Sequence, residues 1–482
     1  MSKSVVRTRM APSPTGEMHV GSLSILLKNY DYAKKHHGQF ILRIEDTDQA
    51  REVEGSVEQI LDVLKIFGLL PDEGPTKGGE YGPYTQSQRL DIYRKHAGEL
   101  VANDKAYHCF CSRERLEEVR AQKRADHLPP KYDRHCRSLT PEEVKTKLEA
   151  GKENVIRLKV PDDKKVKFND LIRGEIEFDS NQVDDQVLLK SDGFPTYHLA
   201  VVIDDHLMKI SHVMRGEEWI SSTPKHVLLY QAFDWPLPVY AHIPIYLNPD
   251  GKGKMSKRKG TVSVQSFLDK GYLPQTLLNF FMILGWATED EREIMTLDEY
   301  IAEFDPKDIS HKSVVFDLKK LQWLNGMYIR QLEDGELTKL LQPFLPEDYP
   351  ADLLPKVLPL IKERLVLLSD ITHLTTFFYQ PISQDQAGLT KKSSAEEVIS
   401  QLEKTILALA PLENDWSTTK IEIAIRKLQE ENDWHKRQYF MMVRVASTGD
   451  SQTPPLFETM ELIGYYAINK RLKQAQEILQ TT

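Results

Sequence analysis

The chain has 482 residues, of which 40% are hydrophobic and 28% charged, and its formal net charge at pH 7 is −9. This length and composition are typical of a soluble globular protein of roughly two to four domains, and no apolar run is long enough to cross a membrane. The acidic balance argues against general coating of nucleic acid, although a local basic face can still bind RNA phosphates. The N-terminus lacks the apolar core of a signal peptide and three cysteines cannot pair off completely, so we expect a cytoplasmic protein without a disulfide scaffold.

Residues 7–28 are expected to form a short strand, a rigid connection and the start of a helix. Pro12 and Pro14 fix φ and lack a backbone donor, so they interrupt regular structure, whereas Gly16 can adopt backbone angles closed to other residues. Leucines then recur at helical spacing, and Ser22 is a candidate to begin the helix.

A turn that leads into a helix N-terminus presents backbone N–H groups to phosphate. The candidate residues at this turn are Gly16, His19, Gly21 and Ser22. A helix start with an incidental histidine is the competing interpretation, because the pattern His-x-Gly arises easily by chance. Its second occurrence, at 36–38, is interpreted as a simple turn.

The next strand is predicted at 39–46, which is led by Phe, Ile and Leu. Glu45, Asp46 and Asp48 cluster at its carboxyl end, where open α/β sheets place ligands. A metal site or a solvated strand end is the alternative for these acids. Apolar periodicity then predicts amphipathic helices at 54–67 and 88–100.

Residues 103–190 are interpreted as an α/β insertion that contains all three cysteines. Cys109-x-Cys111, followed about 20 residues later by Tyr132-x-x-x-Cys136, is a plausible zinc knuckle because thiolates suit tetrahedral zinc. Three buried thiols without metal are the alternative. Alternating segments at 154–160 and 175–178 predict strands of one small sheet.

The apolar run at 194–205 predicts a buried strand that returns to the main sheet, with Tyr197 near its start. Asp204, Asp205 and His206 at its end are interpreted as part of a capped helix after the strand rather than as a metal site.

A basic loop is predicted at 252–259, and glycines bracket it on both sides. Its central string is Lys254, Met255, Ser256, Lys257 and Arg258. The alternative interpretation is that these charged residues belong to an ordinary solvated surface loop. A loop that closes over a nucleotide needs the same basic residues and flexible ends.

Helical periodicity dominates the remainder, and strand signals are few. The predicted helical or strongly apolar segments are 277–284, 316–328, 353–368, 395–410, 419–430 and 456–479. The polar segment 380–394 is interpreted as a loop within this region.

Several of these motifs together resemble the class I aminoacyl-tRNA synthetases, and the bacterial glutamyl-tRNA synthetases in particular. The blocks that carry the resemblance are RMAPSPTGEMHVG at 9–21, RIEDTD at 43–48, GPYTQSQR at 82–89, SDGFPTYH at 191–198, RGEEW at 215–219 and KMSKR at 254–258. They lie within residues 5–330, and the likeness is weaker towards the end.

The resemblance implies a Rossmann-type parallel sheet with an α/β insertion and an all-α C-terminal domain. The implied division is 1–102 and 191–262 for the two halves of the catalytic domain, 103–190 for the insertion that holds the tRNA acceptor end, 263–328 for a helical stem-contact domain and 329–482 for an anticodon-binding domain. Glutamine-specific and archaeal-type relatives end in β-barrels instead, so the helical tail favours the bacterial glutamate type.

The implied reaction is the ATP-dependent activation of L-glutamate, followed by its transfer to the terminal ribose 2′-OH of tRNA(Glu). His19 and Lys257 are the implied catalytic cations, with Mg²⁺ on the ATP phosphates. The implied ATP-binding residues are Gly16, His19, Gly21, Ser22, Lys254, Met255, Ser256, Lys257 and Arg258. This step needs no acid–base pair because the attacking carboxylate is already ionised; alignment and positive charge suffice.

The implied glutamate-binding residues are Arg9, Ser13, Glu45, Tyr197 and Arg215. Arg9 would bind the α-carboxylate and Glu45 the amino group, and the guanidinium of Arg215 matches a side-chain carboxylate with two hydrogen bonds. An ion pair of Arg215 with Glu217 or Glu218 is the structural alternative. Val201 stands where relatives commonly carry Asn, so one polar contact is expected to differ.

Zinc-bearing relatives often have His where this chain has Ser138, so the chain departs from the usual fourth ligand. Tyr132 is preferred in its place, by resemblance to the shorter glutamyl-queuosine enzymes, over His135 and His127. In the tail, Arg364 and Arg444 are candidate anticodon contacts, with ordinary surface roles as the alternative.

We expect a monomer. The alternatives in function are an enzyme that also charges tRNA(Gln) with glutamate, a glutamyl-queuosine enzyme, which would lack the helical tail, and an inactive RNA-binding paralogue.

Overall fold

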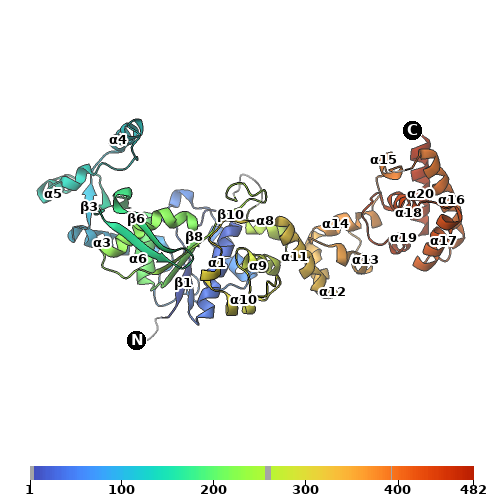
Figure 1. Ribbon diagram of the computed structural model, residues 1–482, viewed down its shortest axis with the longest axis horizontal. Coiled ribbons are helices and arrows are strands. Elements are labelled where there is room, and N and C mark those ends of the chain that lie inside the picture. Colours follow the sequence, from blue (N-terminus) through green and yellow to red (C-terminus); the bar gives the residue numbers. More distant parts are fainter. Residues whose placement is uncertain (1–4, 256–261, 392, 482) are drawn as a thin grey trace. The chain divides into compact units, whose positions relative to one another are not determined.

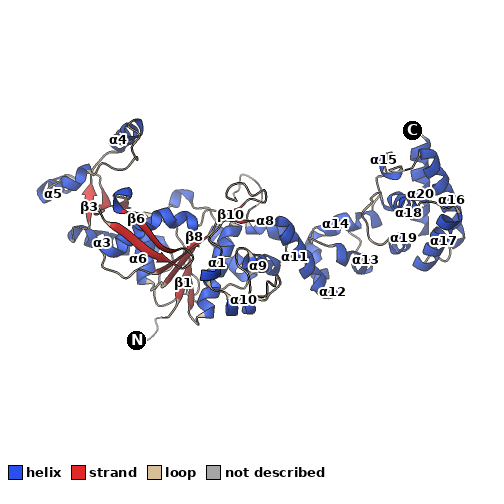
Figure 2. Cartoon of the chain, viewed as in Figure 1, coloured by secondary structure: helices blue, strands red, loops and turns tan. Residues whose placement is uncertain are grey.

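The computed structural model describes residues 5–255, 262–391 and 393–481 (Figure 1). The chain divides into two compact units, the first made of Met1–Phe267 with Leu277–Leu318 and the second of Leu268–Thr276 with Lys319–Thr482. Figure 2 shows that the strands belong to the first unit, whereas the described part of the second unit is helical. The predicted fold class, a parallel-sheet domain followed by an all-helical region, is confirmed.

The centre of the first unit is a largely parallel sheet built from two adjoining pieces. In one piece, β1 (Arg7–Met10) pairs in parallel with β2 (Gln39–Leu42). In the other, the strand order is β6 (Gly174–Asp179), β5 (Lys165–Asp170), β9 (Val239–Ile243) and β8 (His212–Gly216). The Ser211 N–H donates to the Arg7 carbonyl at 3.0 Å, so β1 lies beside β8.

Helix α1 packs on β1, β2 and β8, helix α7 packs on β5, and further helices surround them in or at the edge of the first unit. Their bounds are α1 (Val20–Lys35), α2 (Ser56–Ile66), α3 (Leu90–Ala102), α6 (Tyr197–Leu207), α7 (Thr223–Ala232), α8 (Val264–Asp269), α9 (Pro274–Ile283) and α10 (Leu297–Glu303). In α1, Leu23, Leu26 and Leu27 are fully buried at the predicted helical spacing. The turn predicted at 36–38 separates α1 from β2.

The prediction of a strand at 194–205 is wrong, because these residues begin helix α6. Thr196 has extended backbone angles, and the helix starts at Tyr197. Every residue from Leu199 to Asp205 is buried. A helix buried around most of its circumference has no polar stripe, so its sequence looks like that of an interior strand. Asp204 and Asp205 are accordingly core residues of the helix itself, not of a capped helix after a strand.

The inserted region contributes to two different sheets, which corrects the prediction of one small sheet. Strand β4 (Val155–Leu158) lies between β3 (Ala106–Cys109) and β7 (Val187–Leu189) in an antiparallel sheet. Strands β5 and β6 instead extend the main sheet, since β5 pairs with β9 at Asp170 and Tyr240. Helices α4 (Arg113–Ala125) and α5 (Pro141–Glu149) stand apart from β1 and β8 in Figure 1, and neither contains a buried residue.

Two short strands form a separate parallel pair in the first unit. Strand β10 (Tyr246–Leu247) pairs in parallel with β11 (Val314–Val315). Helix α11 (Leu318–Gln331) follows and leads into the second unit.

The second unit continues with helices around two apolar clusters. Their bounds are α12 (Asp334–Leu341), α13 (Leu354–Ile361), α14 (Asp370–Thr375), α15 (Gln386–Leu389), α16 (Ala395–Leu409), α17 (Thr418–Glu431), α18 (Lys436–Thr448), α19 (Leu456–Ile463) and α20 (Tyr465–Gln480). One cluster gathers around Val357 and Ile361, and the other around Leu402, Ile425 and Leu472.

Three predictions in this unit need correction. The helix predicted at 353–368 ends as an α-helix at Ile361, and the one predicted at 456–479 is two helices separated by Gly464, whose φ is 89°. Helix α18 was not predicted, and the loop predicted at 380–394 contains the short helix α15. Throughout the described residues, no helix is both long and apolar enough to cross a membrane.

Candidate nucleotide and amino-acid site

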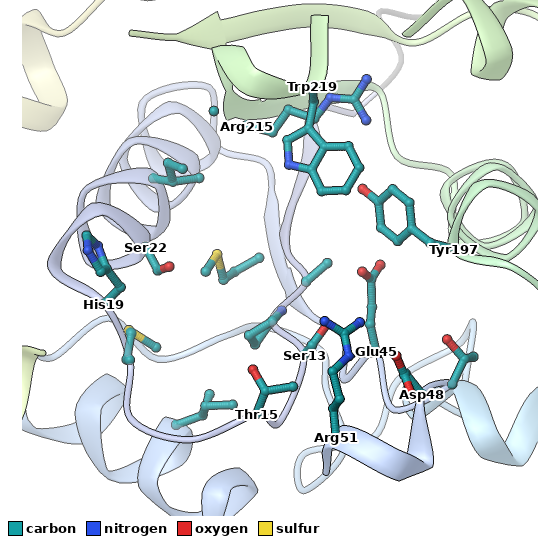
Figure 3. Close-up of a pocket in the computed structure, with 18 of the residues that line it drawn as sticks. Ser13, Thr15, His19, Ser22, Glu45, Asp48, Arg51, Tyr197, Arg215 and Trp219 are labelled. Carbon is teal, nitrogen blue, oxygen red and sulfur yellow. Dashed lines mark hydrogen bonds and ion pairs between the residues drawn. The ribbon is translucent and has the colours of Figure 1, made fainter. Parts of the chain in front are cut away.

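A cavity of about 850 Å³ opens at the carboxyl ends of β1, β2 and β8 and at the N-termini of α1 and α6 (Figure 3). Parallel α/β sheets place ligands at this edge. Figure 3 shows Glu45, Tyr197 and Arg215 gathered on one side, with His19 and Ser22 on the other. The predicted residues that line the cavity are Arg9, Ser13, Gly16, His19, Ser22, Glu45, Tyr197 and Arg215.

A second cavity of about 340 Å³ adjoins the first. The two share His19, Ser22, Ile25, Gly216 and Glu218, so they form one continuous cleft. The second cavity adds the remaining described candidates for nucleotide binding, which are Gly21, Lys254 and Met255.

His19 stands at the junction of the two cavities, where it caps helix α1. Its backbone is extended, and its Nδ1 accepts a hydrogen bond from the Gly21 N–H at 2.9 Å. The helix therefore begins at His19, and Ser22, which was predicted to begin it, lies inside the first turn. A Cβ on residue 21 would lie 3.1 Å from the His19 Nδ1, so the glycine leaves room for the imidazole.

The segment that follows 256–261 lies against the start of α1. Val264 N–H donates to the Met18 carbonyl and Val20 N–H to the Val262 carbonyl, both at 2.9 Å. On the other side, Lys254 Nζ donates to Glu218 Oε1 at 2.9 Å, and Lys254 lines the same cavity as His19. The predicted residues Ser256, Lys257 and Arg258 themselves lie outside the described residues.

Arg9 belongs to a buried ion network beside the larger cavity. Its Nε donates to Asp205 Oδ1 at 3.1 Å, and Arg43 donates to Asp205 at 2.8 Å and to Glu45 Oε1 at 3.0 Å. Burial alone would raise the pKa of Asp205, but the two guanidinium groups outweigh it and the pKa is lowered. Burial raises the pKa of Glu45 despite Arg43 and Arg9.

The same network continues through Asp204, which sequence reasoning did not assign to the site. Asp204 accepts from Arg89 Nε at 2.7 Å, from Tyr93 at 2.8 Å and from Gln86 at 2.9 Å. The network therefore contains three arginines and three acids, so its charges cancel. Arg89 belongs to a block quoted above, but only the fold brings it to α6.

Arg215 is buried, and its contacts differ from those of Arg9. Its Nε donates to His242 Nε2 at 3.1 Å, one Nη to His226 Nδ1 at 3.1 Å and the other to Thr223 Oγ1 at 2.8 Å. The proposed ion pair with a neighbouring acid is absent among the described residues: Glu217 pairs with Arg173, and Glu218 pairs with Lys254. Sequence reasoning missed both histidines, which occur in no motif.

Aromatic rings line the cavity beside Arg215. The rings of Tyr197 and Trp219 are 4.5 Å apart, and the Arg215 guanidinium lies 5.8 Å from the Trp219 ring centroid. Burial, together with the charge of Glu45, raises the pKa of Tyr197 to about 12, so its hydroxyl stays a donor at neutral pH. Val201 lies in the core of α6 and is buried.

The three cysteines lie close together in the inserted region, and they are not among the residues that line the two cavities. The Sγ atoms of Cys109, Cys111 and Cys136 lie within 4.8 Å of one another, and those of Cys111 and Cys136 are 3.5 Å apart. The Tyr132 hydroxyl is 3.3 Å from the sulfurs of both Cys109 and Cys111. In a tetrahedral site with zinc–sulfur bonds of about 2.3 Å the sulfurs would be about 3.8 Å apart, so this set fits zinc.

In the second unit, Arg364 is exposed at the end of a 3₁₀ turn, and Arg444 is half-buried in α18. Burial and the charge of Arg364 lower the pKa of Arg444. Arg444 also donates to the Pro454 carbonyl at 2.7 Å.

Comparison with known proteins matches both units. Residues 5–323 match the family "tRNA synthetases class I (E and Q), catalytic domain", and residues 336–476 match "Anticodon binding domain". A glutamate–tRNA ligase of Finegoldia magna is 43% identical over 490 residues, covering 98% of this chain and 99% of that protein. One of Dehalococcoides mccartyi (strain CBDB1) is 46% identical over 469 residues, covering 95% and 94%.

The solved structures agree. The crystal structure of a glutamate tRNA ligase from Elizabethkingia meningosepticum in complex with its amino acid has a TM-score of 0.86 and 36% sequence identity, and the match covers 99% of this chain and 100% of that one. A glutamate–tRNA synthetase from Elizabethkingia anophelis has a TM-score of 0.87 at the same identity, over 98% and 100%. The chain therefore belongs to the class I tRNA synthetases of the glutamate and glutamine family.

Proposed function

We propose that the protein is a glutamate–tRNA ligase, which activates L-glutamate with ATP and transfers the glutamyl group to the terminal ribose 2′-OH of tRNA(Glu), releasing AMP and diphosphate. The family includes glutamate and glutamine enzymes, so the residues of the site decide which of the two amino acids is bound. The observation that carries the choice is Arg215, a buried cation in the cavity wall with no acidic contact among the described residues.

The charges of the site favour a dicarboxylate amino acid. The network around Arg9 and Arg43 is neutral as a whole, so it suits the zwitterionic backbone of an amino acid, with Arg9 near the α-carboxylate and Glu45 near the amino group. Arg215 adds a positive charge beyond that network, and no acidic side chain among the described residues contacts it directly. A side-chain carboxylate would neutralise it, whereas a neutral amide would leave the buried charge unpaired.

In the first step, an oxygen of the glutamate α-carboxylate attacks the α-phosphorus of ATP. A phosphorus–oxygen bond forms, the bond to the bridging oxygen breaks, and diphosphate leaves with its magnesium ion, which enters as part of the substrate. Both reactants are anions, so the protein's task is to align them and to place positive charge near the phosphates. We assign this task to His19 and Lys257, with Lys254 and Arg258 in support.

The described residues support the approach of these groups. The segments 254–255 and 262–264 flank the stretch that contains Lys257. Residues 262–264 lie against residues 18–20, and Lys254 and Met255 line the smaller cavity together with His19, Gly21 and Ser22. We assign the part of the larger cavity around Arg9, Glu45 and Arg215 to glutamate. We assign the smaller cavity, with the adjoining part of the larger one, to the nucleotide, with Gly16, Gly21, Ser22, Met255 and Ser256 around ATP. Ser13 and Tyr197 complete the glutamate side.

In the second step, the tRNA 2′-hydroxyl attacks the glutamyl carbonyl carbon. An ester bond forms, the bond between that carbon and the phosphate oxygen breaks, and AMP leaves while the hydroxyl proton passes to the phosphate oxygen. We propose that the insertion at 103–190 holds the acceptor end and that residues 329–482, including Arg364 and Arg444, contact the anticodon. The catalytic domain would then comprise 1–102 and 191–262, with 263–328 against the tRNA stem. We expect a monomer that acts in the cytoplasm, where tRNA is charged.

We also propose a structural zinc ion in the insertion, held by Cys109, Cys111, Cys136 and the Tyr132 oxygen. The support is the donor set: three sulfurs at distances that suit tetrahedral zinc, with the hydroxyl between two of them. Zinc would fix the connection between β3 and the turn that contains Cys136.

The test is ATP–diphosphate exchange and aminoacylation with purified protein. We expect charging of tRNA(Glu) with glutamate and none with glutamine. Charging of tRNA(Gln) with glutamate would identify an enzyme that does not discriminate between the two tRNAs. Exchange with glutamate in the absence of tRNA would favour the glutamyl-queuosine type, and inactivity with every tRNA would contradict the proposal.

A further inference from the structure

Arg215 is the donor in each of its hydrogen bonds to the neighbouring side chains. A guanidinium can only donate, so the ring nitrogens that contact it, His242 Nε2 and His226 Nδ1, must carry lone pairs. Neither histidine can be protonated at that nitrogen without losing its bond to Arg215. Both are buried, with 0% and 2% of their surface exposed.

The partners of the opposite ring nitrogens fix the same tautomers. His242 Nδ1 lies 2.6 Å from Asp170 Oδ2, so it holds the ring proton and donates it to the carboxylate. Asp170 is held in turn by the backbone N–H groups of His242, Ile172 and Arg173 at 3.0 to 3.1 Å. A chain of contacts thus runs from Asp170 through His242 to Arg215.

His226 is fixed from its other side. Its Nε2 lies 2.9 Å from His198 Nδ1, and because Nδ1 of His226 accepts from Arg215, this Nε2 is the donor. Burial and the adjacent Arg215 charge lower the pKa of His226 well below its usual value, and burial also lowers that of His242. Both rings are therefore neutral acceptors at physiological pH.

Other cations near this wall have acidic partners instead. Arg9 pairs with Asp205, Arg173 with Glu217, and Lys254 with Glu218. A carboxylate at either histidine position would hold Arg215 equally well, but it would also cancel its charge. Three of the five guanidinium N–H groups are used by His242, His226 and Thr223, which leaves two for a ligand.

We propose that His226 and His242 are positioning residues for amino-acid selection: they orient Arg215 through neutral acceptors and so keep its charge available for the side-chain carboxylate of the substrate. Asp170 and His198 set the tautomers that make this possible. This inference rests on the proposed glutamate specificity and names the residues that sustain it.

The test compares two variants of one position that differ only in charge. Asn places an oxygen near the position of the imidazole Nδ1, so His226→Asn keeps a neutral acceptor for Arg215, and His226→Asp has the same shape with a negative charge. His206→Asn is the matched control, because His206 is another histidine whose pKa burial lowers, but it stacks on Trp235 at 3.8 Å and does not contact Arg215. The full-length protein is assayed for charging of tRNA(Glu) with glutamate and with glutamine, and for the KM of ATP.

His226→Asn is expected to lower kcat/KM for glutamate about threefold to tenfold and to keep the preference over glutamine. His226→Asp is expected to lower the preference for glutamate over glutamine at least about tenfold below that of His226→Asn. The loss should come mainly from a higher KM for glutamate, and the KM for ATP should stay within about twofold of wild type. His206→Asn is expected to behave as wild type.

Equal preferences in the Asn and Asp variants would overturn the inference, as would equal effects on glutamate and ATP. If circular dichroism shows that His226→Asp does not fold, the pair His242→Gln and His242→Glu makes the same comparison at the Nε contact. A wild-type protein that does not charge glutamate at all would instead refute the proposed function, so the two failures are distinguishable.

Discussion

Replacing Arg215 by Gln should abolish the preference for glutamate while leaving the fold intact. In the structure, three N–H groups of Arg215 contact neutral acceptors and two remain for a ligand. Two hydrogen bonds to a charged group at about 1.5–3 kcal/mol each give a loss of about 3–6 kcal/mol. The expected decrease in kcat/KM for glutamate is therefore about 10² to 10⁴-fold.

The stability of the Arg215→Gln variant separates this loss from misfolding. The substitution leaves at least one of the acceptors at His226 and His242 without a donor, but it also removes a buried positive charge without an acidic partner. These effects oppose each other, so we expect the free energy of unfolding to change by only about 1–2 kcal/mol. Steady-state charging and thermal unfolding are measured on the same preparation. An active variant with glutamate kcat/KM within threefold of wild type would refute the assigned role of Arg215.

Three further predictions test other parts of the structure. Gly21→Ala places a Cβ 3.1 Å from His19 Nδ1, so it should displace the imidazole and lower kcat for diphosphate exchange about tenfold or more, while the helix propensity of alanine offsets part of the cap bond that is lost; equal activity would contradict the role of His19. Metal analysis should find one zinc per chain, Cys136→Ser should lose it, and His135→Ala should keep it; retention of zinc by the serine variant would exclude the proposed ligand set. Burial, with the charge of His36, lowers the pKa of His212 to about 4. In the unfolded chain, His212 binds a proton below about pH 6.5, whereas in the folded protein it stays neutral down to about pH 4. The contribution of neutral His212 to the free energy of unfolding is therefore complete above pH 6.5, and it is lost as the pH falls towards 4, by up to about 1.4 kcal/mol per pH unit. His212→Asn should therefore narrow the stability gap to wild type, or reverse it, between pH 6.5 and 4 in urea unfolding, and a gap independent of pH would contradict the prediction.

The elements that sequence patterns identified are those with one polar face. Helices α16 and α17 alternate apolar and charged residues at helical spacing, and both are found within two residues of the predicted bounds. Helix α6 has no such stripe, because residues Leu199 to Asp205 are all buried, so its β-branched run has the pattern of a buried strand. The break at Gly464 has a sequence signal, because a glycine within a helical pattern often marks the end of a helix.

The candidate site divides in a similar way. Arg9, Glu45, Tyr197 and Arg215 occur in short motifs, and the structure brings all four to one cavity. The partners that give Arg215 its character could not be found in the same way. His226 and His242 follow it by 11 and 27 positions, and Asp170 lies in the predicted insertion. The pairing of β5, β9 and β8 brings Asp170, His242 and Arg215 together, and helix α7, which packs against β5, adds His226.

The most direct test is a crystal structure with L-glutamate and a non-hydrolysable ATP analogue bound. The side-chain carboxylate of glutamate should lie within about 3 Å of the free N–H groups of Arg215, with the α-carboxylate near Arg9 and the α-phosphate beside His19. A glutamate side chain directed away from Arg215, or a triphosphate far from His19, would contradict the assignment of both cavities.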